Sequence, residues 1–117
     1  MKGENIAMRL RLFAAGAVRL CRRLPDDVAA KHITRQLVRA ATGGGANYEE
    51  ARGAESRADF IHKLGIVRKE LNETAVWLKI VAQIVAVKPE NIVAILQENL
   101  ELARIISASI RTARNDQ

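Results

Sequence analysis

The apolar residues of this chain recur at alternating steps of four and three positions, and this spacing runs through four separate stretches. Positions three and four apart share one face of a helix, so the spacing indicates a heptad seam. The clearest seam contains Phe60, Leu64, Val67, Leu71, Thr74, Leu78, Val81 and Val85. A second row, formed by Ile66, Val76, Trp77 and Ile80, lies beside it. We therefore expect this helix to face more than one neighbour.

This central helix has recognisable ends. Ser56 followed three positions later by Asp59 resembles a capping box, which marks a helix start. Pro89 marks the far end, because proline cannot continue a helix. Between Ser56 and Val87 only Gly65 disfavours a helix, at a cost of about 1 kcal/mol relative to alanine. The sequence predicts one long helix across this stretch.

The N-terminal stretch predicts a helix from about Glu4 to Leu24. Its seam contains Ile6, Leu10, Phe13, Ala17, Leu20 and Leu24. Pro25 ends this helix, and Asp26 or Asp27 can cap the next one, because aspartate accepts hydrogen bonds from backbone N–H groups of a first helical turn.

The next stretch contains three consecutive glycines, Gly43 to Gly45. Its seam contains Ile33, Leu37, Ala40, Gly44, Asn47 and Ala51. A glycine run can form a loop that divides the segment, or it can lie inside one long helix. The periodicity stays in phase across the glycines, so we favour the long helix, ending near Gly53. The cost, on the order of 1 kcal/mol per glycine, must be offset by tertiary or subunit packing.

The last helix begins at Pro89, a favourable residue for a first helical turn. Its seam contains Ile92, Leu96, Asn99, Ala103, Ile106 and Ile110, widened by Ile95, Leu102 and Ile105. Short connections make consecutive helices antiparallel neighbours. At 117 residues, the chain predicts a single all-α domain over residues 1–117, an antiparallel up-down-up-down four-helix bundle.

Several polar side chains fall on or near the inward seams. They are Asn47, Glu50, Glu70, Glu73 and Asn99. A buried amide without a partner costs about 1–3 kcal/mol, so we expect Asn47 to bond with Glu70, Glu73 or Asn99 across helices. An inward asparagine can fix helix register or oligomeric state. We favour such a structural polar network over ligand binding by Asn47 or acid–base chemistry by Glu70 and Glu73.

The composition narrows the candidate chemistry. Apolar residues make up 49% of the chain and aromatic residues 3%, which favours a core of Leu, Ile, Val and Ala. No apolar run reaches the roughly 18–20 residues of a membrane span, and the single cysteine, Cys21, cannot form an internal disulfide. These features predict a cytoplasmic protein without membrane attachment. Asp59 and His62 form half of one di-metal motif, so we expect no metal, no cofactor and no catalytic residues.

The charge is concentrated at the N-terminus. The formal net charge is +6, and residues 1–25 carry six Lys or Arg against one acidic residue. Such asymmetry favours a polyanionic partner, RNA or DNA, although a basic face also serves solubility. The candidate nucleic-acid-binding residues are Arg9, Arg11, Arg19, Arg22 and Arg23. No aromatic residues are interleaved among them, which favours phosphate contact over sequence-specific recognition of a single strand.

The segment from Gln36 to Leu78 resembles the core pattern of the "four helix bundle protein" family. These small bacterial proteins are also called 23S rRNA intervening-sequence proteins. The matching positions are Ala46-Asn47-Tyr48, Glu50-Ala51, Ser56, Phe60, Lys63-Leu64, Lys69-Glu70, Glu73-Thr74 and Trp77-Leu78. The resemblance implies a continuous second helix and a homo-oligomer, a pentameric ring. The chain is more distantly similar to the accessory protein of diversity-generating retroelements, a basic pentamer that works with a reverse transcriptase and nucleic acid.

Charge and resemblance together lead to two functional hypotheses. The first is a non-enzymatic homo-oligomer that binds nucleic acid through the basic face of its first helix. The alternative is a scaffold or accessory subunit that binds other proteins through its wide apolar stripes and has no direct contact with nucleic acid.

Overall fold

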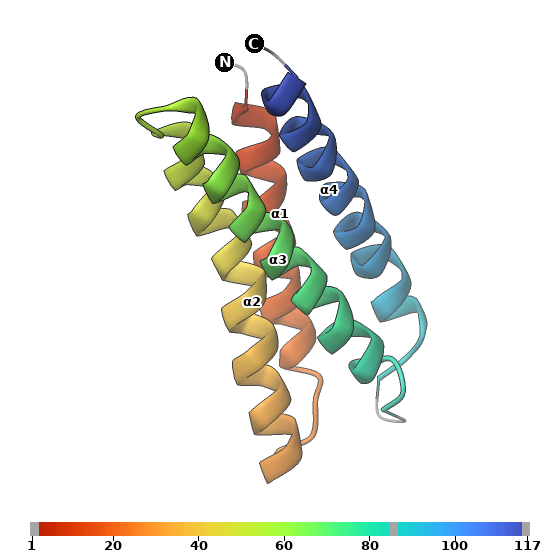
Figure 1. The fold of residues 1–117 in the computed structure, drawn as a ribbon. Helices are drawn as coiled ribbons and strands as arrows, with labels where there is room; N and C mark the ends of the chain where they lie inside the picture. The colour runs from red at the N-terminus through yellow and green to blue at the C-terminus, as the bar shows by residue number, and fades with distance from the viewer. Residues whose placement is uncertain (1–2, 85–86, 116–117) are drawn as a thin grey trace.

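The computed structural model describes residues 3–84 and 87–115, which form four helices. They are α1 (Glu4–Cys21), α2 (Val28–Arg52), α3 (Arg57–Val81) and α4 (Glu90–Asn115). Each helix runs opposite to the one before it, so the start of α1 and the end of α4 lie at the same end of the molecule (Figure 1). α1 and α3 each pack against both α2 and α4, and within the described residues the diagonal pairs do not meet. The predicted antiparallel four-helix bundle is confirmed.

Two predicted helix starts are confirmed by their caps. The Asp27 carboxylate accepts a hydrogen bond of 2.8 Å from the N–H of Ala30 at the start of α2. The Ser56 hydroxyl accepts one of 3.1 Å from the N–H of Asp59 at the start of α3. Each cap satisfies a backbone donor that a helix start leaves without an intrahelical partner.

The glycine run lies inside α2, as the uninterrupted periodicity predicts. A Cβ atom placed on Gly44 would lie 3.8 Å from the Leu71 side chain of α3. One placed on Gly45 would lie 3.8 Å from the Leu10 side chain of α1. These are ordinary van der Waals distances, so α1 and α3 pack directly on this segment. That packing offsets the low helix propensity of glycine.

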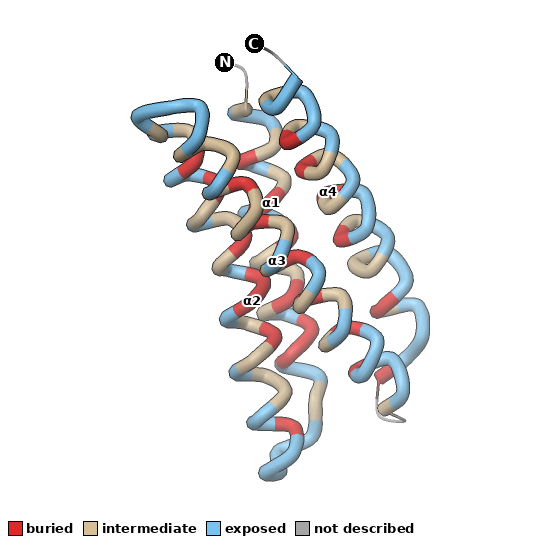
Figure 2. The backbone as a smooth tube through the Cα atoms, in the orientation of Figure 1, coloured by how far each residue is buried: buried red, intermediate tan, exposed pale blue. Residues whose placement is uncertain are grey.

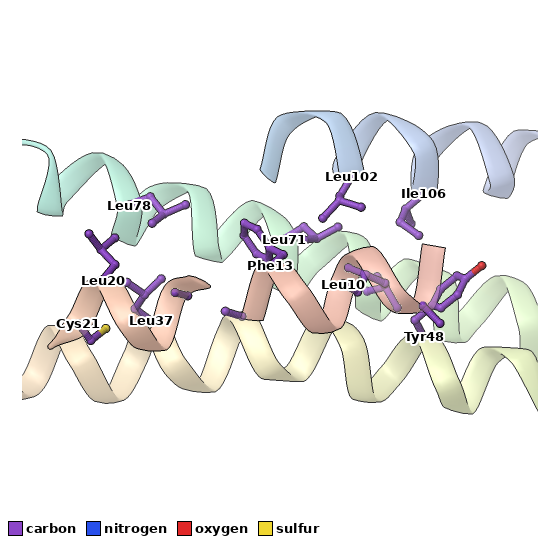
Figure 3. Packing of buried hydrophobic residues seen from close by; sticks show 14 of the residues in the cluster. Leu10, Phe13, Leu20, Cys21, Leu37, Tyr48, Leu71, Leu78, Leu102 and Ile106 are labelled. Carbon is purple, nitrogen blue, oxygen red and sulfur yellow. The ribbon is translucent and has the colours of Figure 1, made fainter. Parts of the chain in front are cut away.

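All four helices contain buried positions (Figure 2). The core that these positions form consists mainly of aliphatic side chains (Figure 3). Its largest fully buried apolar residues are Leu10, Leu37, Leu64, Leu71, Leu78, Leu102, Ile106, Ile110, Val67 and Val81. Burying one such side chain contributes about 1.5–3 kcal/mol, so these heptad seams dominate the stabilisation of the fold. Thr74 is also fully buried, and its hydroxyl donates a 2.7 Å hydrogen bond to the carbonyl of Glu70 one turn earlier.

Two helices end earlier than predicted. α1 ends at Cys21 rather than Leu24, because the residue before Pro25 is disfavoured in the α conformation and the last residues form tighter turns instead. α3 ends at Val81, after which successive turns reverse the chain and bury Val87. The predicted seam position Val85 lies outside the described residues.

Some predicted faces also differ. Val76 and Ile80, expected to widen the buried stripe of α3, are exposed, while Trp77 is half-buried and packs edge-on against His32 of α2 at 5.8 Å between ring centroids. On α2 the buried position belongs to Tyr48 rather than to Asn47. The heptad spacing locates the centre of each inward face, but the neighbouring helices decide how far that face extends.

Candidate nucleic-acid interface

The N-terminal half of α1 uses its arginines within the bundle. Arg9 donates two hydrogen bonds to Glu98 of α4, from Nε at 3.0 Å and from Nη2 at 2.7 Å. This two-point geometry is the strong form of an arginine–carboxylate pair. The hydrogen bond to Glu98 also raises the pKa of Arg9 above its ordinary value. Arg9 therefore links α1 to α4, and its positive charge is largely compensated.

Arg11 joins a second compensated group between α1 and α2. Its Nη1 lies 3.4 Å from Oε1 of Glu49, and Arg52 lies 3.1 Å from the same oxygen. Arg52 also pairs with Glu4 at 3.0 Å. Two arginines thus face two glutamates, so this cluster has no excess charge to attract a phosphate.

The C-terminal end of α1 and the turn that follows it are different. Arg19, Arg22 and Arg23 are exposed, and no side-chain hydrogen bond or ion pair joins them to any other residue in the described part of the chain. Arg19 lies in the last turn of α1, and Arg22 and Arg23 follow directly after its last residue. We call this group the arginine trio. Its charge also interacts favourably with the partial negative charge at the C-terminus of α1.

The surrounding surface is basic as well. The end of the bundle that carries the trio comprises residues 17–35, 78–84 and 87–94, which contain seven Lys or Arg and three Asp or Glu. One of these cations, Arg35 on α2, is exposed and lines a groove at the turn between α1 and α2. The N-terminal charge count did not include Arg35, because its proximity to the trio depends on the antiparallel pairing of α1 and α2.

A second groove, of about 380 Å³, lies between α1 and α4, and we call it the α1–α4 groove. On the α1 side Arg19 and Arg23 line it above an apolar floor. The other residues that line it include Leu12 and Gly16 of α1 and Asn91, Ala94 and Ile95 of α4. Glu98, the partner of Arg9, also lines the groove. Two of the trio's guanidinium groups therefore stand beside an apolar hollow.

The predicted polar network is divided into separate contacts. Asn47 is only partly buried and donates a 2.8 Å hydrogen bond to the carbonyl of Gly43 in its own helix, not to Glu70, Glu73 or Asn99. The expected bond across helices is wrong, because Tyr48 occupies the inward position and turns Asn47 to the flank of α2.

The three glutamates instead form ion pairs between α2 and α3. Glu50 pairs with Lys63 at 2.7 Å, and this bond raises the pKa of the Lys63 amine. Glu70, whose side chain is 17% exposed, lies 3.7 Å from Arg39. Arg39 also hydrogen-bonds Glu73. Lys63 pairs with one glutamate and Arg39 is shared by the other two, so these contacts hold α2 against α3.

Asn99 is fully buried and donates a 3.1 Å hydrogen bond to the carbonyl of Leu71, joining α4 to α3. Its Oδ1 atom has no hydrogen-bond partner among the described residues. In another helix register the Asn99 amide would also lose its bond to Leu71, and leaving a buried amide unsatisfied is costly. Asn99 therefore favours the observed alignment of α3 with α4.

Cys21 has the properties of a structural residue. It is 9% exposed, and burial raises the pKa of its thiol, although a hydrogen bond to Thr34 opposes the shift. Cys21 packs in the core, whereas the arginine trio is exposed (Figure 3). A thiol held in its protonated form is a poor nucleophile.

The described residues contain no group of three or more His, Cys, Asp or Glu arranged to hold a metal ion. Within the same residues, no helix combines the length and the apolar character needed to cross a membrane. The ion pairs between helices, the buried Asn99 and the apolar core define a four-helix bundle in which these polar contacts are structural, and the arginine trio adds exposed charge at one end.

The comparisons with known proteins agree with this class. Residues 5–108 match the family model described as 23S rRNA-intervening sequence protein, and the chain belongs to this family. The predicted resemblance is thereby confirmed. No curated protein matches the chain.

A solved structure supports the same assignment. It is the crystal structure of a protein with unknown function from the S23 ribosomal protein family of Bacteroides thetaiotaomicron. This chain is 33% identical to that protein, with a TM-score of 0.84. The likeness covers 92% of this chain and 99% of the other, so it includes all four helices.

Proposed function

We propose that this protein is a non-enzymatic, self-associating helical bundle that binds RNA or DNA by phosphate contacts at the arginine trio. The observation that carries the proposal is the contrast in pairing along α1. Arg9 and Arg11 are compensated by glutamates, whereas Arg19, Arg22 and Arg23 are exposed and uncompensated. Uncompensated cations release condensed counterions when they meet phosphates, which is the main source of sequence-independent affinity.

The family context supports a nucleic-acid partner. The family description refers to intervening sequences of 23S rRNA, and the crystallised relative belongs to a family named after a ribosomal protein. The buried, protonated Cys21 is compatible with a reducing compartment, and we place the protein in the cytoplasm.

Self-association, as the five-membered ring that the resemblance implies, is supported by apolar side chains that the single chain leaves in solvent. They are Met8 and Leu12 on α1, Val76 and Ile80 on α3, and Val93 and Leu100 on α4. An assembly would repeat the trio around its surface and strengthen a weak phosphate site by avidity. The same apolar residues support the alternative function, a protein-interaction scaffold that does not touch nucleic acid.

The decisive experiment compares two variants that lose the same charge. One variant carries Arg19→Gln, Arg22→Gln and Arg23→Gln. The matched control carries Arg57→Gln, Lys69→Gln and Arg111→Gln, three exposed residues outside the basic end. Binding of fluorescently labelled RNA is measured by anisotropy between about 50 and 200 mM salt, and folding is checked by circular dichroism.

The trio variant should lose most of its affinity, and the slope of log affinity against log salt should fall by about 2–3, roughly one for each phosphate contact removed. The control should keep most of its affinity and slope. Equal losses in both variants would show that bulk charge, not the trio, attracts RNA. If the wild-type protein binds no nucleic acid at the lowest salt, the scaffold function replaces the one proposed here.

A further inference from the structure

The α1–α4 groove has chemistry that phosphate binding alone does not require. Two guanidinium groups of the trio, those of Arg19 and Arg23, line its α1 side, and its floor is apolar. From this combination we infer that the groove takes an unpaired nucleotide of single-stranded RNA or DNA, with the base on the apolar floor and the adjacent phosphates on the two arginines. This inference rests on the proposed nucleic-acid binding and specifies its substrate as single-stranded.

The two arginines reach the groove from neighbouring parts of the chain. Arg19 lies in the last turn of α1 and Arg23 in the turn that follows the helix, and both line the groove. Neither arginine has a carboxylate partner within the described residues, so both are available to a phosphate.

The groove also accommodates a base. Leu12, 63% exposed, and Ile95 of α4 present aliphatic surface, and Gly16 between them contributes no side chain. The faces of a nucleobase are apolar and its edges are polar, and Asn91 supplies an amide in the groove that can both donate and accept hydrogen bonds. A base in a duplex is stacked between its neighbours and cannot enter, so the groove discriminates against double strands.

The single acidic group in the groove does not oppose this arrangement. Glu98 lines it, but both carboxylate oxygens accept hydrogen bonds from Arg9. The compensated pair in the first half of α1 therefore removes the negative charge that would otherwise repel a phosphate beside Arg19.

The dimensions favour a nucleotide over a protein partner. On α4 the lining extends from Asn91 to Glu98, about 10 Å along the helix axis, and the groove volume lies at the small-ligand end of known sites. A stable interface between two protein chains buries about 1,200–2,000 Å² in total, which a groove of this length does not provide by itself.

The test fills the groove without weakening the fold. A Cβ atom on Gly16 would lie 3.6 Å from Ile95 Cδ1 and 3.8 Å from Arg19, both ordinary contacts, so Gly16→Leu extends a side chain over the floor. The matched control is Gly65→Leu on α3, where a Cβ atom would meet nothing within 4 Å. Both changes replace a mid-helix glycine with a better helix former, so neither is expected to unfold the protein.

Anisotropy is measured with one RNA sequence as a single strand and as a perfect duplex, and light scattering records the oligomeric state. The wild-type protein and Gly65→Leu should bind the single strand roughly fivefold or more tighter than the duplex. Gly16→Leu should lose this preference while retaining its duplex binding, because the trio is unchanged.

Three results would overturn the inference. The first is equal binding of both RNA forms by the wild-type protein. The second is an unchanged preference for the single strand in Gly16→Leu. Either result contradicts the inference but leaves the proposed function standing. The third is a smaller oligomer for Gly16→Leu with undiminished strand preference, which assigns the groove to a second copy of the chain. Absence of all nucleic-acid binding would remove the proposed function together with the inference, so the two failures are distinguishable.

Discussion

The two ends of α1 both carry arginines, but these arginines have different roles. The first half places Leu10 in the core and joins its arginines to α2 and α4 through glutamates. The second half and the turn that follows it carry three exposed arginines whose side chains have no partners among the described residues. An arginine on a basic helix is therefore a structural link or a ligand contact according to whether a carboxylate faces it across the bundle. The predictions below test this division.

The largest effect should come from the buried side of the first half. Leu10→Ala should lower the free energy of unfolding by about 2–5 kcal/mol, because it leaves a cavity in a fully buried position. The control is Leu12→Ala two positions away, which should change it by less than about 0.5 kcal/mol. Urea titration measures both. A comparable loss at Leu12 would mean that another chain covers the outward face of α1 in solution.

Glycine substitutions should change the stability in opposite directions at the N-cap of α1 and inside this helix. Gly3→Ala should destabilise the fold by about 1–2 kcal/mol, because Gly3 has a φ of 89°, which is unfavourable for alanine. Gly16→Ala should stabilise it by up to about 1 kcal/mol, since Gly16 lies inside the helix and has room for a methyl group. Thermal unfolding of the two variants should shift in opposite directions, and a shift in the same direction would contradict the assigned helix start.

The Arg9–Glu98 ion pair should contribute a smaller amount to the free energy of unfolding. Arg9→Gln should cost about 0.5–1 kcal/mol, a modest value because both partners remain about one-third exposed. Arg19→Gln should lower the free energy of unfolding by less, since it loses only the favourable interaction with the C-terminus of α1 and no ion-pair partner. A double-mutant cycle of Arg9→Gln with Glu98→Gln isolates the coupling, and zero coupling would show that the pair positions groups without stabilising the fold.

The smallest effect concerns Cys21, which belongs to the buried side of the second half. Burial raises the pKa of its thiol in the folded protein, so the unfolded chain loses this proton at a lower pH. The stabilisation that results is present below the ordinary thiol pKa and is lost as the pH rises through the folded value. The decline in melting temperature above about pH 8.5 should therefore be shallower in Cys21→Ala than in the wild-type protein. An identical decline would indicate that Cys21 is exposed to solvent.

Local patterns were the reliable part of the sequence prediction. The heptad seams identified four helices, and the Asp27 and Ser56 caps occupy their predicted positions. The uninterrupted periodicity across Gly43–Gly45 correctly favoured one helix over a loop. These features depend on residues within one or two turns of each other, which is the range over which helical periodicity and capping act.

The errors concern residues whose partners lie on other helices. Asn47 has the spacing of a seam residue, yet Tyr48 takes the buried position because its larger side chain fits between the start of α1 and α2. Glu70 and Glu73, expected to bond with Asn47, pair with Arg39 instead. The helical period locates a face only to within about one residue, and packing against neighbouring helices decides between adjacent candidates.

By itself, the sequence determined that this protein is an all-α bundle with a basic first helix, because helix periodicity, caps and charge are properties of short segments. Only the tertiary structure decided which arginines are compensated. Arg9 pairs with Glu98, which is 89 positions away in the sequence, and Arg11 pairs with Glu49, which is 38 positions away. The α1–α4 groove likewise exists only where the first and last helices meet. The physical reason is that electrostatic pairing and surface shape depend on distances in space, which the spacing along the chain does not specify.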